Sequence, residues 1–87
     1  GLEHQHAKDA AVIRSLRDAA ERSRRHEMEH ALKALAKGDD PAAVLEQLSQ
    51  RLTNKFLHAP TQALNQAESD RNELQALATR LFNLHHE

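Results

Sequence analysis

The 87-residue sequence contains no cysteine, tryptophan or tyrosine, and only two residues each of glycine, proline and phenylalanine. Without cysteine no disulfide can hold the chain together, and the composition is compatible with the cytoplasmic location that we expect. With so few aromatic residues, the core must be built mainly from leucine and alanine. Such a core is thin for a monomer, because small domains commonly need a staple or a partner. The composition therefore favours a homodimer.

The sequence also lacks an excess of one charge and any long apolar run. Its 12 Lys and Arg residues against 13 Asp and Glu residues give a formal net charge of -1, which argues against DNA binding by bulk electrostatics. No apolar run approaches the length that spans a membrane, and no signal-peptide pattern opens the chain. Since Ala, Leu, Glu, Gln, Lys and Arg dominate, we predict a single all-α domain over residues 1–87.

The first predicted element is a long helix over residues 8–37, which contains neither proline nor glycine and stops at Gly38, a natural C-cap. The charged segment 21–27 offers almost nothing to bury, so we expect the middle of this helix to be exposed. Two pairs in it, Glu21 with Arg25 and Glu29 with Lys33, have the favourable i,i+4 order. Its apolar residues lie towards the two ends: Ile13, Leu16 and Ala20, and then Met28, Ala31, Leu32 and Leu35. We predict a strut that packs at its Leu32 and Leu35 end.

Residues 40–87 are predicted to form three shorter helices joined by short loops, which should fold back on one another as a bundle. The carboxylate of Asp40 can cap the first of them, and Pro41 suits its first position. That helix is expected to end before Pro60, because proline lacks the N–H that a continuing helix would need.

The second of these helices is short and covers about residues 61–67. The third is predicted over about residues 72–84, and Asp70 and Glu73 before and within it have the spacing of a capping box. Apolar residues on the first and third helices recur at spacings of three and four, which places them on one helical face. We assign these residues to the core or the dimer interface: Leu45, Leu48, Leu52, Phe56, Leu74, Leu77 and Leu81.

The run LTNKFLHAPT, residues 52–61, interrupts the helical pattern around it. Its Ala-Pro step disfavours a helical backbone before the proline, while the proline suits the start of another helix. We therefore predict a corner between two helices, in which a ring nitrogen of the histidine binds a carbonyl left unpaired at the helix end. The residues assigned to this corner are Asn54, Lys55, His58, Pro60 and Thr61.

LTNKFLHAPT, followed by Gln62-Ala63-Leu64, resembles the signature of the C-terminal dimerisation domain of glutamyl-tRNA reductase. Residues 38–41 (GDDP), residues 44–49 (VLEQLS) and the charged helix of residues 13–35 also resemble that family, so the resemblance covers nearly the whole chain. Phe56 stands where an aliphatic residue is more usual. The resemblance implies a homodimerising parent enzyme that reduces glutamyl-tRNA with NADPH to glutamate-1-semialdehyde, for tetrapyrrole (porphyrin and haem) biosynthesis.

The same resemblance implies that the catalytic and NADPH-binding domains of the parent oxidoreductase precede this segment. The nucleophile of that family is a cysteine, and this sequence has none. No glycine-rich turn is present to hold a dinucleotide, because the only glycines are Gly1 and Gly38. We therefore carry over no catalytic, cofactor-binding or metal-binding residue, and expect the segment alone to be catalytically inert and without a cofactor.

Two other functions are consistent with parts of the sequence. His26, Glu27 and His30 match the HExxH pattern of zinc hydrolases, in which two histidines grip zinc and the glutamate activates its water. That reading needs a third ligand and a sheltered cleft, which this charged helix does not suggest.

The other alternative is a helical binding module that contacts tRNA or a regulatory protein. Arg22, Arg24 and Arg25 could touch phosphates of the tRNA. The interleaved glutamates Glu21, Glu27 and Glu29 weaken the positive field of this group.

Overall fold

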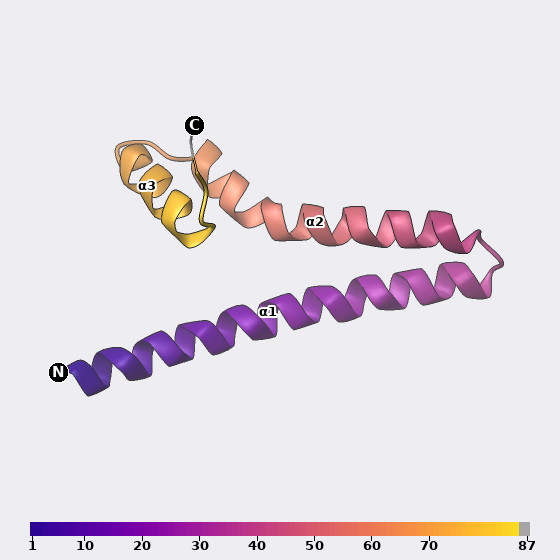
Figure 1. Cartoon of the computed structure of the whole chain (residues 1–87), viewed down its shortest axis with the longest axis horizontal. Coiled ribbons are helices and arrows are strands. Elements are labelled where there is room, and N and C mark those ends of the chain that lie inside the picture. Colours follow the sequence, from indigo (N-terminus) through magenta and orange to yellow (C-terminus); the bar gives the residue numbers. More distant parts are fainter. Residues whose placement is uncertain (86–87) are drawn as a thin grey trace. The chain divides into compact units, whose positions relative to one another are not determined.

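A computed structural model describes residues 1–85, which form three helices and no strand (Figure 1). The helices are α1 (Leu2–Ala36), α2 (Pro41–Asn65) and α3 (Arg71–Leu81). The predicted all-α fold with a long N-terminal helix is confirmed. The prediction of three shorter helices over residues 40–87 is wrong, since two helices follow the first loop; residues 86 and 87 of that span lie outside the described residues.

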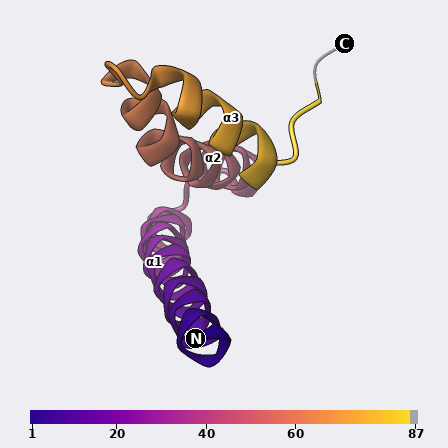
Figure 2. The same ribbon diagram turned by 90° about the vertical axis from the view of Figure 1, so that its left-hand side faces the viewer.

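The chain divides into two compact units, residues 1–54 and residues 55–87, and the boundary falls within α2. The first unit contains α1 and the first part of α2. The second contains the rest of α2 and α3, which follows it after a short turn (Figure 2).

The loop between α1 and α2 is fixed at both sides by the backbone. Gly38 has φ of 95°, in the left-handed region that favours glycine. Its N–H donates to the Leu35 carbonyl at 3.0 Å, and the Asp39 N–H donates to the Ala34 carbonyl at 3.1 Å, which is the Schellman pattern. Asp40 Oδ2 then accepts from the Ala43 N–H at 3.1 Å and caps α2. Both the glycine stop and the Asp40 cap are confirmed.

The buried residues of the first unit lie where α1 and the first part of α2 run side by side. Ala31, Ala34 and Val44 form the buried cluster, and Leu48 packs against it, partly exposed. The end of α1 that we predicted to pack does pack, but through its alanines; Leu32 and Leu35 remain exposed. Alanines at this contact let the two helix backbones approach closely.

The predicted corner at Pro60 is wrong, because α2 continues through this proline to Asn65. Asn54, Lys55, His58 and Thr61 also lie within α2, and their side chains are exposed, so the assigned corner contacts have no helix end to serve. Physically, proline removes one intrahelical hydrogen bond and biases the residue before it, but it does not forbid a helix. The rich supply of helix formers on both sides carries α2 through it, and the separate helix over residues 61–67 does not exist.

The turn from α2 to α3 depends on a residue that the sequence analysis missed. Arg71 donates to the Leu64 carbonyl at 3.2 Å and to the Ala67 carbonyl at 2.6 Å, where α2 has run out of intrahelical donors. Asp70 is the N-cap residue of α3 but makes no capping hydrogen bond from its side chain; its Oδ1 accepts from the Glu68 N–H instead. The predicted capping box is therefore wrong.

Candidate dimerisation surface

The most prominent surface feature of the chain is its exposed large apolar side chains. On α2 and α3, Leu45 is 65% exposed, Phe56 63% and Leu81 70%. On α1, no residue within positions 1–26 is buried, although this segment carries several aliphatic side chains. The exposed large apolar residues are Leu2, Val12, Ile13, Leu16, Met28, Leu32, Leu35, Leu45, Phe56, Leu57, Leu77, Leu81, Phe82 and Leu84. A monomer seldom leaves so much apolar surface in water, and such surfaces usually mark an interaction site.

The seven residues that we assigned to the core or dimer interface fall into two groups. Leu48, Leu52 and Leu74 are partly buried by their own chain. The other four, which are Leu45, Phe56, Leu77 and Leu81, are exposed. Of these seven side chains, the four exposed ones offer most of the apolar surface that a second chain could cover.

Within the second unit, Phe56 on α2 contacts Phe82, the residue that ends α3. The ring centroids lie 5.5 Å apart and the ring planes are inclined at 87°, which is the favourable edge-to-face geometry. Phe82 has the backbone position of a helix C-cap, and Asn83 after it has φ of 52°. The contact fixes α3 against α2 while one face of the Phe56 side chain remains accessible.

The most buried side chain in the described part of the molecule is a charged one. Glu27 on α1 is 1% exposed, and its carboxylate accepts hydrogen bonds from the guanidinium of Arg51 on α2. The second of these, from Nη2 to Oε1, measures 3.5 Å. We expected this stretch of α1 to offer almost nothing to bury, and that expectation is wrong at Glu27. Arg51 was not singled out at all.

The histidines of the HExxH pattern do not share the environment of its glutamate. His26 and His30 are exposed, whereas Glu27 is buried against Arg51. In residues 1–85, no group of three or more His, Cys, Asp or Glu side chains is placed so that it could hold a metal ion. The carboxylate of Glu27 therefore makes a structural ion pair with Arg51, and is not placed to activate a metal-bound water.

Two of the three arginines in the basic group on α1, Arg24 and Arg25, share the carboxylate of Glu21. Arg24 Nε lies 3.1 Å from both carboxylate oxygens of Glu21, and Arg25 Nε lies 3.5 Å from Oε1 of the same residue. The hydrogen bond from Arg24 holds the pKa of the Glu21 carboxyl below its usual value and raises the pKa of Arg24 itself. The predicted pairs Glu21–Arg25 and Glu29–Lys33 are both confirmed, the latter at 3.3 Å.

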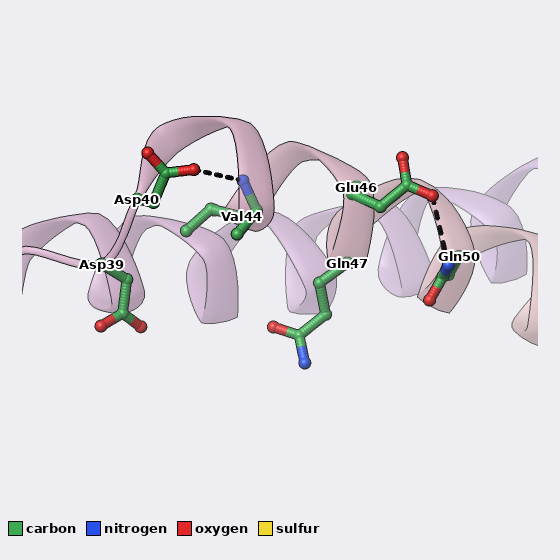
Figure 3. A pocket seen from close by; sticks show the side chains of 7 residues that line it. Asp39, Asp40, Val44, Glu46, Gln47 and Gln50 are labelled. Carbon is green, nitrogen blue, oxygen red and sulfur yellow. Dashed lines mark hydrogen bonds between the residues drawn. The ribbon is translucent and has the colours of Figure 1, made fainter.

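A shallow pocket beside the start of α2 is lined by five polar side chains together with Ala43 and Val44 (Figure 3). Asp40 in this pocket is already used as the cap of α2, and Glu46 accepts a hydrogen bond from Gln50 at 3.2 Å. These carboxylates serve the helix itself, so the exposed apolar faces remain the candidate functional surface.

Helices that bury alanines and expose leucines define a helical association domain. The chain belongs to the family described as "Glutamyl-tRNAGlu reductase, dimerisation domain", whose model matches residues 2–84. The family resemblance noted in the sequence is thereby confirmed.

Two curated proteins illustrate how similar the relatives are. The glutamyl-tRNA reductase of Thiobacillus denitrificans is 60% identical over 77 residues, and that of Nitrosomonas europaea is 59% identical over 76 residues. These alignments cover 87% and 86% of the chain but only 18% of each relative. The chain therefore spans less than a fifth of the length of the proteins it matches. No solved structure matches the chain, and none of the described helices is long and apolar enough to cross a membrane.

Proposed function

We propose that this domain holds two copies of its parent enzyme together through the exposed apolar faces of α2 and α3. The observation that carries the proposal is the burial of small side chains in place of large ones: Ala31, Ala34 and Ala67 are buried, while Leu45, Leu77 and Leu81 are exposed. Covering one such side chain contributes about 1.5–3 kcal/mol. A few of them on each copy suffice to offset the entropy lost on association.

The proposed interface is symmetric, because two identical chains related by a two-fold axis use the same patch twice. Leu45, Leu48, Leu52 and Phe56 on α2, with Leu74, Leu77 and Leu81 on α3, are the residues that we propose to contribute to it. The near-neutral net charge of -1 leaves little electrostatic repulsion between the copies.

Sedimentation equilibrium of the 87-residue chain tests this proposal. The expected result is a dimer at micromolar concentration, and a helical, stable monomer at that concentration would overturn it. Leu45→Asp should shift the equilibrium towards monomer, because it places a charge in an apolar interface. Gln47→Asp is the matched control, since this side chain is also exposed and close to Leu45 on α2 but is polar already.

We further propose that the parent is a cytoplasmic, NADPH-dependent glutamyl-tRNA reductase that supplies glutamate-1-semialdehyde for tetrapyrrole synthesis. Similarity to reductases named for this activity supports the proposal, and the alignments place the chain in a minor part of their length. Neither the cysteine nucleophile nor the NADPH site is expected here, because both belong to the remainder of such an enzyme. The parent protein should consume NADPH when given glutamyl-tRNA, and this domain alone should not. Absence of turnover by the full-length protein would reject the proposed reductase activity and would leave the proposal of a dimer unaffected.

A further inference from the structure

The fully buried part of the contact between α1 and the first part of α2 ends at an ion pair. Proceeding from the loop, Ala34 and Ala31 on α1 are buried, then Glu27. Beyond Glu27 no residue of α1 is fully buried, although Ser23 and Glu21 are partly buried. On the first part of α2, Val44 is buried, and Leu48, Arg51 and Leu52 are partly buried, in that order from the loop. Glu27 and Arg51 thus lie about two helical turns beyond Ala34 and Val44 on their respective helices. The pair closes the contact at the end that is farthest from the loop.

The side chains between the loop and this pair restrict the helices only weakly. Ala31, Ala34 and Val44 are small, and apolar contacts carry no directional preference. Hydrogen bonds between a guanidinium and a carboxylate are directional and charge-assisted, so they hold two groups in one relative orientation. A buried ion pair adds little to net stability compared with apolar side chains of similar size, and orientation is the better-supported use of one.

We infer that Glu27 and Arg51 form a clasp that sets the direction in which the exposed half of α1 leaves the first part of α2. The loop fixes one end of this helix pair through the Gly38 turn and the Asp40 cap. The clasp fixes the other end, at the last fully buried residue of α1. The loop and the clasp hold α1 against the first part of α2 at two separate points. Two points of attachment fix the direction of α1, whereas the loop alone would leave α1 free to rotate about it.

A consequence for the parent rests on the proposed function. In an enzyme whose other domains lie before this segment, α1 is the element that connects them to the dimer. The direction of α1 then sets the direction in which each copy holds those domains. Glu27 and Arg51 are accordingly positioning residues, remote from any chemistry.

Pulsed electron paramagnetic resonance can measure the direction of α1 within residues 1–54. Because the sequence has no cysteine, Arg14→Cys on α1 and Gln47→Cys on α2 introduce two spin labels without background. Both positions are exposed. Mixing the labelled chain with an excess of unlabelled chain leaves at most one labelled copy per dimer, so the distance is intramolecular. The doubly labelled chain without further substitutions should give a single narrow distribution of distances between the two labels.

The decisive variant replaces both partners, Glu27→Leu together with Arg51→Met. Apolar replacement of a buried ion pair is commonly neutral or stabilising, so helicity and the thermal midpoint should be kept. The distance distribution should lose its single narrow peak and become broad. Arg24→Ala is the matched control, because it removes an exposed ion pair of α1 and should leave the distribution unchanged. A narrow, unshifted peak in the folded double variant overturns the clasp.

A second variant keeps the inference testable if the double variant does not fold. Arg51→Lys retains the charge at a side chain that is 38% exposed, but it loses the fork that bonds both carboxylate oxygens. A broadened distribution in this variant supports the clasp, and an unchanged one overturns it. Sedimentation of the same samples tests the proposed function separately. A monomer with a narrow distance distribution would count against the dimer alone. A dimer whose distribution does not respond to these substitutions would count against the clasp alone.

Discussion

The covered contact between α1 and α2 and the exposed faces of α2 and α3 use opposite kinds of side chain. The contact is made from Ala31, Ala34 and Val44 with one ion pair, whereas the exposed faces carry leucine and phenylalanine. Burial normally favours the larger apolar residues. In this chain the fully buried apolar residues are all small, and most of the large apolar residues are exposed.

The difference separates two tasks within one short sequence. Ala31 and Ala34 on α1 pack with Val44 on α2 and form the buried contact of the helical hairpin. Leucines at the exposed faces would contribute hydrophobic free energy when a partner chain buries them. The first region should therefore govern the shape of the chain, and the second its association. Each of the following substitutions acts on one region and tests whether the other responds.

The largest effect is expected from Arg51→Met, which leaves Glu27 buried without the guanidinium. Breaking a buried ion pair from one side should lower the free energy of unfolding by about 3 kcal/mol. Urea unfolding at a fixed chain concentration measures it, since dimer formation makes apparent stability depend on concentration. Arg24→Met, at an exposed pair, should cost under about 1 kcal/mol. Equal effects of the two substitutions would contradict the distinct role of the buried contact.

Leu81→Ser acts on the exposed faces alone. If the partner covers this side chain, its loss removes about 1.5–3 kcal/mol of association free energy, which is tenfold or more in the dissociation constant. The helicity of the chain should hardly change, because Leu81 is 70% exposed within it. Sedimentation and circular dichroism give the two readouts. Gln75→Ser on the same helix is the control. If the two variants have the same dimer dissociation constant, Leu81 is not part of the interface.

Asp40→Ala should weaken the start of α2, and with it the loop side of the contact. Loss of the hydrogen bond to the Ala43 N–H should cost about 1 kcal/mol. Asp39→Ala is the neighbouring control, because its carboxylate lies 3.9 Å from Lys37 Nζ and caps nothing. The difference between the two thermal midpoints is the measurement. The comparison requires that neither substitution changes the dissociation constant by as much as Leu81→Ser.

The smallest effect concerns pH and the exposed pair of Glu21 with Arg24. Because the hydrogen bond from Arg24 lowers the pKa of Glu21 from its ordinary 4.5, its contribution is complete above that value. It is lost as the pH falls through the lowered pKa of the folded state. A slight loss of α1 helicity in acid should therefore be absent in Glu21→Gln and reduced by salt. Circular dichroism titration of the two chains checks this, and identical titration curves would count against it.

The elements with strong local signals were predictable from the sequence. Gly38 and Asp40 each have a specific backbone role, so the end of α1 and the start of α2 could be placed to within a residue. The apolar spacing on α2 and α3 selected Leu45 and Leu77, which are exposed in the structure; their place in an interface stays a prediction. The motif LTNKFLHAPT identified the family correctly, although its proposed corner does not exist.

The parts that were missed depend on which residues meet in space. Proline at position 60 signals a break locally, but the helix formers on both sides of it favour a continuous α2. In the sequence, nothing distinguishes Glu27 from the other charged residues in the polar stretch of α1. Its burial follows from Arg51, 24 positions away on another helix, and no periodicity within either helix reports that pairing. Arg71 was missed for a similar reason, since its role is to satisfy carbonyls of the preceding helix.

The tight turn at Gly38 has a consequence for the order of folding. It brings α1 and α2 together across only a few residues, so the contacts it closes are close in sequence, and chains with such contacts fold fast. Helix pairing then precedes any encounter between two chains, because association depends on concentration and is slower. The dimer is expected to assemble from hairpins that already exist, and a refolding experiment should show a fast phase independent of concentration followed by a slower one that accelerates as chains are added.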